Sequence, residues 1–261
     1  MKKVFAVILS ALMLLSCASA MAEGAFRVGM ECNYAPYNWT QAEPSEFTVP
    51  IEGGGGYADG YDVQIENTAW DGLIPSLQSD KADLVISSMT ITDERKQSVD
   101  FSDAYAMAQL AILANADSGV ASIDDLNQPG KKVAVKTGST GDVYATKNLT
   151  NAEIVRLADE SACVTEVVQG KADGFLYDQL TIYRNHQANP DTTEAVFIPF
   201  QDAEEWGIAV KKGNTELLDQ LNAFIAQSKT DGEFDRLTEK YLSEEKKAFD
   251  QYGFKWFFDF E

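Results

Sequence analysis

Short apolar runs alternate with amphipathic segments along the chain. Runs with the length and composition of buried strands cover residues 25–30, 61–65, 83–86, 132–136, 152–157, 174–177, 195–200 and 207–210. Between them lie segments with apolar residues at helical spacing, such as residues 70–77. Strands that alternate with helices are typical of an α/β fold. The run at 61–65 is also compatible with the start of a helix.

The C-terminal part of the chain is predicted to be mainly helical. Apolar side chains recur at helical spacing over residues 215–228 and are expected in the core: Leu217, Leu218, Leu221, Phe224 and Ile225. The Asp231-Gly232 pair ends this helix and a last helix follows. The aromatic tail at 252–260 is expected to pack back onto the fold.

The first residues have the pattern of a secretory signal. Lys2 and Lys3 precede an apolar run at 4–15, which is too short to span a membrane, and small residues follow it. We therefore expect residues 1–22 to be a signal peptide and the protein to be exported, to the periplasm or the outer face of the cytoplasmic membrane. Cleavage after the small residues and lipid attachment at Cys17 remain alternatives.

Composition excludes several classes of function. The 261 residues suffice for two ordinary cores or one large one, and the net charge of −20 argues against a nucleic-acid partner. One histidine and three cysteines leave little material for a zinc site or a histidine-based triad, so we expect no metal and no cofactor. Cys32 and Cys163 would remain after signal removal. An oxidising compartment permits a disulfide between them without establishing one.

One stretch, residues 81–101, combines a strand with groups that suit a small carboxylate. The strand at 83–86 runs into Ser87, Ser88, Met89 and Thr90, and Arg95 follows. Hydroxyls, free peptide groups and a guanidinium at a strand end can hold a carboxylate. A surface turn with a solvated arginine is the alternative.

This stretch has an echo later in the chain. Lys81-Ala82-Asp83 leads into a strand that ends in serines, and Lys171-Ala172-Asp173 leads into a strand that ends at Asp178. The repetition suggests two similarly built α/β lobes.

A third polar strand end lies at residues 137–141, just before a predicted helix. Its small residues include Ser139 and Thr140, and the amide groups at a helix N-terminus form a ready anion site. A simple N-cap is the alternative, and both roles can coexist. The glycine run at 53–56 lacks the spacing of a phosphate-binding loop.

Taken together, these stretches resemble bacterial extracellular solute-binding proteins of family 3, the polar amino-acid receptors of ATP-binding-cassette importers. The resemblance covers nearly the whole chain after the signal, in order, through ECNYAPY at 31–37, YDV at 61–63, WDGLIPSL at 70–77, the stretch 81–101 continued by Ser102-Asp103, VAVKTGST at 133–140, KADGFLYD at 171–178 and GIAVKK at 207–212.

The resemblance implies a two-lobed periplasmic-binding-protein-like fold of type II, with a ligand cleft between the lobes. Crossovers near Ala106 and Trp206 would make lobe 1 discontinuous, at 23–106 and 207–261, and lobe 2 would cover 107–206. Binding energy would then favour a closed state.

The resemblance also implies roles for individual residues at the ligand's carboxylate. Arg95 would clamp the α-carboxylate, because a planar fork of donors matches it. Thr90 and Thr140 would assist, together with the turn that contains Ser139.

Other groups would hold the rest of the ligand. Asp178 and either Ser87 or Ser88 would take the α-ammonium. Tyr34 and Trp70 would enclose the ligand's side chain between their rings.

The chain departs from the family in its first lobe. Four residues separate Ile65 from Trp70, whereas a crossover between parallel strands needs roughly 10 to 12. We therefore predict that lobe 1 lacks one usual β-α element, which would leave an exposed edge, an apolar patch or a rearranged sheet.

The leading hypothesis is a monomeric, non-catalytic receptor that captures a polar or charged L-amino acid and delivers it to the membrane permease of an ABC transporter. A prephenate- or arogenate-type dehydratase on the same fold is the alternative, with Glu31 as its general acid. The sensor domain of a membrane receptor is a third class, disfavoured because no membrane-spanning or signalling segment follows.

Two residues bear on ligand choice in opposite directions. Glu31 occupies the place where relatives put an acid against a cationic side chain, which favours arginine, lysine or histidine. Lys136, if it faces the cleft, would favour an acidic or amide ligand.

Overall fold

The structure, a computed structural model, describes residues 26–41, 48–52, 57–59, 63–252 and 255–259. The predicted signal with Cys17, the glycine run at 53–56, and Tyr61 and Asp62 lie outside the described residues. The chain forms two compact units. Unit 1 comprises Met1–Ser88, Gln97–Asp100 and Ala209–Leu217, and unit 2 comprises Met89–Lys96, Phe101–Ile208 and Leu218–Glu261. The boundaries of the two lobes inferred from the resemblance stay a prediction.

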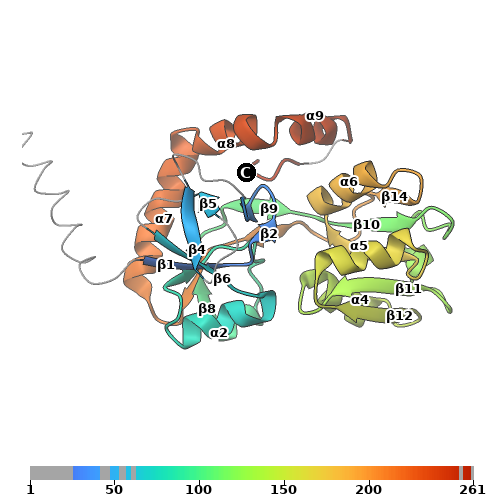
Figure 1. Ribbon diagram of the computed structural model, residues 1–261, viewed down its shortest axis with the longest axis horizontal. Coiled ribbons are helices and arrows are strands. Elements are labelled where there is room, and N and C mark those ends of the chain that lie inside the picture. Colours follow the sequence, from blue (N-terminus) through green and yellow to red (C-terminus); the bar gives the residue numbers. More distant parts are fainter. Residues whose placement is uncertain (1–25, 42–47, 53–56, 60–62, 253–254, 260–261) are drawn as a thin grey trace, which may run out of the picture. The chain divides into compact units, whose positions relative to one another are not determined.

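A seven-stranded sheet in the order β5-β4-β6-β1-β7-β16-β8 forms the centre of unit 1 (Figure 1). Its strands are β1 (Phe26–Met30), β4 (Thr48–Glu52), β5 (Tyr57–Asp59), β6 (Val63–Asn67), β7 (Leu84–Val85), β8 (Val99–Phe101) and β16 (Ala209–Lys211). β1 lies parallel to β6 and β7, with Val28 opposite Ile65 on one side and Leu84 on the other. The carboxyl ends of these three strands therefore meet at one edge of the sheet.

A short helix connects β6 to β7. The 3-10 turn η1 (Trp70–Gly72) leads into α2 (Leu73–Gln78), in which Leu73 and Leu77 are fully buried. Pro75 lies in the first turn of α2, where its missing N–H has no helical partner to lose. The helix predicted at 70–77 is thereby confirmed, and the described part of the run at 61–65, from Val63 on, belongs to strand β6.

In the residues that the structure describes, the connection from β1 to β6 contains strands and no helix. It contains the pair β2 (Asn33–Tyr34) and β3 (Asn38–Trp39), and then β4 and β5. β4 pairs antiparallel with β5 and parallel with β6, so this pair extends the sheet beyond β6. Such a sheet fits the expectation of a rearranged lobe, and the absence of one usual β-α element stays a prediction.

A five-stranded sheet in the order β12-β11-β13-β10-β14 forms the centre of unit 2. Its elements are β10 (Leu110–Asn115), β11 (Lys132–Lys136), β12 (Glu153–Leu157), β13 (Gly174–Asp178) and β14 (Thr193–Val196), with helices α3 (Ile123–Leu126), α4 (Thr140–Asn148), α5 (Glu160–Val168) and α6 (Gln179–Ala188). β11 is parallel to β12 and β13, and β10 is antiparallel to β13 and β14.

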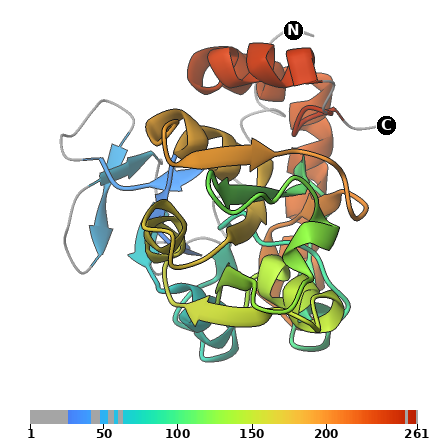
Figure 2. The same ribbon diagram turned by 90° about the vertical axis from the view of Figure 1, so that its right-hand side faces the viewer.

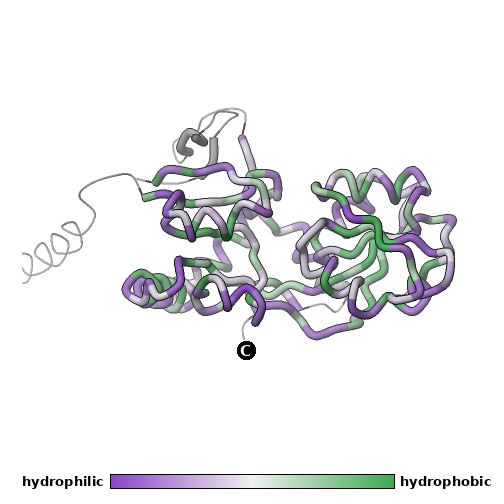
Figure 3. Tube along the Cα trace, turned by 90° about the horizontal axis from the view of Figure 1, so that it is seen from below, coloured by the Kyte–Doolittle hydropathy of each residue, from purple (hydrophilic) through white to green (hydrophobic). Residues whose placement is uncertain are grey.

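Both faces of this sheet are buried, as the alternation along β10 shows. Ile112 and Ala114 pack in a core with Leu126 of α3 and Ala145 of α4. Ala111 and Leu113 face the opposite side, where α5 and α6 supply side chains such as Cys163 and Ile182. Successive strand residues point to opposite faces, so a strand covered on both sides reads as a continuous apolar run. The hydrophobic segments of the tube in Figure 3 follow these strands.

From Leu218 onward the C-terminal part of the chain belongs to unit 2. Helices α7 (Thr215–Thr230), α8 (Glu233–Tyr241) and α9 (Ser243–Tyr252) follow one another (Figure 2). Phe257 is fully buried, its carbonyl accepts from the Met107 N–H at 2.7 Å, and its ring lies 5.6 Å from that of Trp206. The Trp256 indole donates to Thr238 of α8 at 2.9 Å. In the part of the tail that the structure describes, the prediction that it packs back is confirmed.

The assignment of Phe224 to the core was wrong. Its side chain is 65% exposed, whereas Ile225 on the same helix is buried. Adjacent helical residues differ by roughly 100° in direction, and the core of α7 lies on the Ile225 side of the helix.

Candidate functional site

The strand ends of unit 1 bring Glu31, Ser87 and Ser88 together. The Glu31 N–H donates to the Ser87 hydroxyl oxygen at 3.0 Å. The Ser88 hydroxyl donates to the Asn38 side-chain oxygen at 3.2 Å, and the Asn38 amide donates to the Glu31 carbonyl at 2.5 Å. These contacts arise because Glu31 follows β1 and Ser87 follows β7, two parallel neighbours.

The backbone at Ser88 has an uncommon conformation. Its φ is 50°, in the left-handed region that favours glycine. A serine held there turns the chain sharply after β7. Such backbone conformations concentrate at functional sites, so this one is consistent with Ser87 and Ser88 as candidate site residues.

The predicted aromatic residues of unit 1 lie at two different points. Tyr34, in β2, stacks on Tyr37 with ring centroids 5.5 Å apart. Trp70 begins η1, directly after β6, and is half-buried. Their predicted role in enclosing a ligand side chain stays a prediction.

Arg95 lies in unit 2, where its guanidinium joins two segments. Nη1 donates to the Thr90 carbonyl at 2.7 Å, and Nη2 donates to the Gly138 carbonyl at 3.1 Å. Burial lowers the pKa of the guanidinium, opposed by the nearby Glu204, Tyr177 and Glu94. Arg95 is therefore half-buried and bound to two carbonyls, and its role as a carboxylate clamp stays a prediction.

The turn before α4 serves as a helix cap. Ser139 is 5% exposed, and its hydroxyl accepts from the Asp142 N–H at 3.2 Å. Gly141 allows the first turn to lie against β13, since a Cβ there would meet the Leu176 carbonyl oxygen at 2.4 Å. The N-cap alternative is thus realised by Ser139, while the Thr140 hydroxyl points to a different partner.

That partner is Glu204, which the sequence analysis missed. Its Oε2 accepts from the Thr90 hydroxyl at 2.9 Å and from the Thr140 hydroxyl at 2.8 Å, and its Oε1 accepts from Gln201 at 2.7 Å. Burial raises the pKa of Glu204, opposed by these hydrogen bonds and by the charge of Arg95.

Strand periodicity could have found Glu204. It lies two residues before the buried Trp206 in β15 (Glu204–Trp206), so both side chains share one face of the strand. A carboxylate on the buried face of a strand requires partners, and this signal was available in the sequence.

Asp178 ends β13 and caps α6. Its Oδ1 accepts from the N–H groups of Leu180 at 3.0 Å and Thr181 at 3.1 Å, and its Oδ2 accepts from the Thr181 hydroxyl at 2.9 Å. Its role toward a ligand ammonium stays a prediction.

Lys136 and the two cysteines are buried. The Lys136 side chain is 2% exposed, and its charge acts on Cys163, whose pKa burial nonetheless raises to about 12. Burial, together with the Glu31 charge, raises the pKa of Cys32 to about 11. Both cysteines are free thiols.

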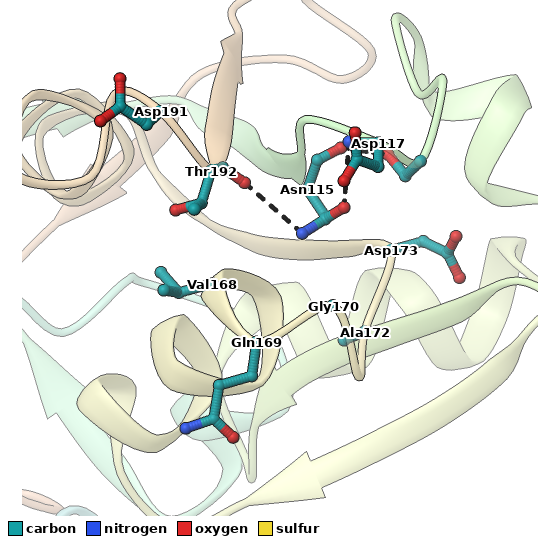
Figure 4. Close-up of a pocket in the computed structure, with 10 residues that line it drawn as sticks. Asn115, Asp117, Val168, Gln169, Gly170, Ala172, Asp173, Asp191 and Thr192 are labelled. Carbon is teal, nitrogen blue, oxygen red and sulfur yellow. Dashed lines mark hydrogen bonds between the residues drawn. The ribbon is translucent and has the colours of Figure 1, made fainter.

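A cavity of about 410 Å³ lies at the opposite end of the β13 strand from Asp178 (Figure 4). Asn115, Asp117, Gly170, Asp173 and Thr192 are among its lining residues. Its polar groups bind one another: the Asn115 amide donates to the Thr192 carbonyl, and the Asp117 N–H donates to the Asn115 side chain. None of the predicted site residues lines this cavity.

Within the described residues, no three histidine, cysteine, aspartate or glutamate side chains are grouped to hold a metal ion. The helices of this part of the chain include none long and apolar enough to cross a membrane.

The arginine, the hydroxyls and the helix N-terminus at the strand ends of this α/β protein suit a small ligand that carries a carboxylate. The chain belongs to the bacterial extracellular solute-binding proteins, family 3, whose family model matches residues 26–244. The resemblance inferred from the sequence is confirmed.

Known relatives are named for amino acids. A probable histidine-binding protein of Neisseria gonorrhoeae is 32% identical over 225 residues, which cover 84% of this chain and 84% of the relative. The L-arginine-binding protein of Pseudomonas aeruginosa is 32% identical over an alignment of 272 residues that covers 97% of this chain and 99% of the relative.

The fold agrees with solved structures of the same kind. A crystal structure of an ancestral amino acid-binding protein, described as a precursor of cyclohexadienyl dehydratase, matches with a TM-score of 0.71 and 34% identity over 87% of this chain and 98% of that one. The relatives are named as binding proteins, which supports a non-enzymatic solute-binding protein over the dehydratase alternative.

Proposed function

We propose that this protein is an extracytoplasmic receptor that captures a polar or charged L-amino acid and delivers it to the permease of an ABC transporter. One observation carries the proposal: Arg95 is held by the carbonyls of Thr90 and Gly138, beside the hydroxyls of Thr90 and Thr140. A fixed guanidinium fork with adjacent hydroxyl donors matches an α-carboxylate in shape and charge.

The remaining predicted residues would take the other parts of the ligand. Asp178 and the serines after β7 would receive the α-ammonium, and Tyr34 with Trp70 would contact the side chain. These groups come from both units, and the proposal requires that one amino acid contacts them together.

A cationic side chain is the favoured choice. The names of the histidine- and arginine-binding relatives support it, and Glu31 is an acidic group at the strand ends of unit 1. Lys136, which would favour an acidic or amide ligand, is buried beside α5. The proposed receptor acts as a monomer outside the cytoplasm, either free or anchored at Cys17.

A thermal-shift panel of the standard amino acids on the chain from residue 23 onward tests the proposal. We expect one or a few L-amino acids, cationic ones first, to raise the melting temperature, since a ligand that binds the folded state stabilises it. Arg95→Ala should abolish the shift. Arg236→Ala, at an arginine of α8 with a 73% exposed side chain, is the matched control and should keep it.

A flat panel on folded protein would contradict the receptor function. Turnover of prephenate or arogenate, with no amino acid retained, would instead support the dehydratase alternative.

A further inference from the structure

A carboxylate already lies at the hydroxyls that the proposed function assigns to the ligand. Glu204 Oε2 is 2.9 Å from the Thr90 hydroxyl and 2.8 Å from the Thr140 hydroxyl, and Arg95 is close enough for its charge to act on Glu204. One glutamate oxygen thus has the two hydroxyl partners, and the nearby cation, that an amino acid's α-carboxylate would need.

The position of Glu204 is fixed by the backbone on both sides. In the β15 ladder Glu204 pairs with Ala108 of β9 (Ala106–Ala108), and the Ile91 N–H donates to the Glu205 carbonyl at 2.8 Å. Thr90 forms a β-bridge with Trp206. Gln201 binds the second carboxylate oxygen at 2.7 Å. Glu204 can therefore leave the hydroxyls only by rotating its side chain.

The chemistry of a hydroxyl makes the two carboxylates competitors. A threonine hydroxyl has one proton to donate, and both Thr90 and Thr140 donate theirs to Glu204. A ligand carboxylate that arrives at Arg95 also places two negative charges in one partly buried site, where they cannot both stay ionised without a large penalty.

We propose that Glu204 is a built-in occupant of the carboxylate subsite, so that an amino acid binds there only when Glu204 gives up the two hydroxyls, which it does by taking up a proton. This inference rests on the proposed function and adds a specificity-determining residue to it. Once protonated, Glu204 carries no charge against the ligand and can donate a hydrogen bond, which leaves each hydroxyl free to turn toward the ligand.

The surroundings agree with a glutamate that accepts a proton readily. Burial raises the pKa of Glu204, and Arg95 is the charged group that opposes this shift. A second carboxylate at Arg95 would divide the attraction of that cation and raise the pKa further. The other titratable groups on the surrounding segments are Asp93, Glu94, Asp142, Tyr177, Asp202 and Glu205.

Four of these groups are paired with a cation or exposed to solvent. Asp142 forms an ion pair with Arg156 at 2.9 Å, and Asp93, Asp202 and Glu205 are exposed. Glu94 and Tyr177 act on Arg95.

The sign of the pH effect follows from proton uptake. If the liganded form binds one more proton than the free form, affinity rises as the pH falls, by up to about tenfold per pH unit. The rise covers the interval between the pKa of Glu204 in the free protein and its higher pKa in the complex. Glu204→Gln removes the charge while keeping the shape, so it should bind more tightly at high pH and lose most of the pH dependence.

Calorimetry with L-arginine from about pH 5 to about pH 7 tests this, because the α-ammonium and the guanidinium of that ligand stay protonated over this interval. Where L-arginine does not bind, the amino acid with the largest thermal shift replaces it. Glu205→Gln, on the exposed neighbour of Glu204, is the matched control. Repeating each titration in buffers of different ionisation enthalpy counts the protons taken up.

We expect the wild type and Glu205→Gln to take up close to one proton and to bind more weakly as the pH rises. Glu204→Gln should take up none and bind about tenfold or more tightly than the wild type at about pH 7. The melting temperature of each variant, measured without ligand, confirms that it is folded.

Two results would overturn the inference alone. Wild-type binding with no proton uptake and a flat pH profile excludes a competing glutamate, and weaker binding by folded Glu204→Gln makes Glu204 a direct ligand contact. Both leave the receptor function intact. Absence of amino-acid binding by wild type and Glu204→Gln at every pH would overturn the proposed function, and this inference with it.

Discussion

The Lys-Ala-Asp triplets of the two units make the same local structure. In unit 1, Asp83 accepts from the Arg27 N–H at 2.8 Å and pairs with the Arg27 guanidinium at 2.7 Å, while the Asp83 N–H donates to the Arg27 carbonyl at 2.9 Å. In unit 2, the Asp173 carboxylate accepts from the Lys132 N–H at 2.7 Å and pairs with the Lys131 ammonium at 2.9 Å, while the Asp173 N–H donates to the Lys132 carbonyl at 2.8 Å.

The preceding turns agree as well. The N–H groups of Lys81 and Ala82 both donate to the Ser76 carbonyl, and those of Lys171 and Ala172 both donate to the Glu166 carbonyl. Each triplet therefore ends a helix and fastens the following strand to the start of its neighbour, β1 in one unit and β11 in the other.

The two units differ at the other end of the strand that follows the triplet. The first strand leads into Ser87 and Ser88. The Ser87 hydroxyl accepts from the Glu31 N–H, and the Ser88 hydroxyl donates to the Asn38 side chain. The second ends in Asp178, which caps a helix. The comparison teaches that the repeated residues are structural, whereas the residues that could recognise a ligand lie where the two copies diverge.

Removing the triplet aspartates should have the largest effect on stability. Asp83→Ala and Asp173→Ala each remove a charged acceptor and leave a backbone N–H without its partner, so each should lower the free energy of unfolding by about 2 kcal/mol. Urea denaturation measures the loss. Lys81→Ala and Lys171→Ala, at the exposed lysines of the same triplets, should change it by less than about 0.5 kcal/mol. An aspartate variant as stable as its lysine control would break the comparison.

The cap at the diverging strand end should contribute less. Asp178→Ala should lower the free energy of unfolding by about 1 kcal/mol through loss of the α6 cap, and Asp178→Ser should keep most of it, since serine is also a good N-cap. If Asp178 also receives the ligand ammonium, both variants lose the thermal shift. A serine variant that keeps full ligand binding would restrict Asp178 to the structural role.

The smallest effect concerns pH. Burial alone would raise the pKa of Asp83, but hydrogen bonds from the Arg27 side chain and backbone outweigh it, and the net pKa is lowered. The stabilisation is therefore fully present above the unfolded-state pKa, about 4, and disappears as the pH falls through the folded-state pKa. The stability difference between wild type and Asp83→Asn, followed by denaturation in acid, should shrink in that window. A difference that grows in acid would contradict this.

Much of the fold was accessible from the sequence because it depends on local patterns. Apolar runs predicted several strands of each sheet, such as β1 and β7 in one and β11 and β13 in the other, but not β10. The triplet echo predicted two similarly built units. Arg95 was identifiable as a candidate because a strand end followed by a guanidinium suits a carboxylate. These features depend on residues close together in the chain.

The features that were not predicted from the sequence depend on contacts between residues that are distant in the chain. Strand periodicity could place Glu204 on a buried strand face, but Thr90 and Thr140 are far from it in sequence, so their hydrogen bonds to it were not predictable. Phe224 fits the helical spacing, but which side of α7 is covered depends on the rest of the unit. The β4–β5 pair beside β6 likewise depends on pairing that a helix-or-strand pattern does not specify.

A crystal structure of the protein with its bound amino acid tests the central claim most directly. We predict that the ligand's α-carboxylate accepts from Arg95 and from the hydroxyls of Thr90 and Thr140, with Glu204 turned away from both hydroxyls. A bound amino acid whose carboxylate lies elsewhere, with Glu204 still on the two hydroxyls, would contradict the account.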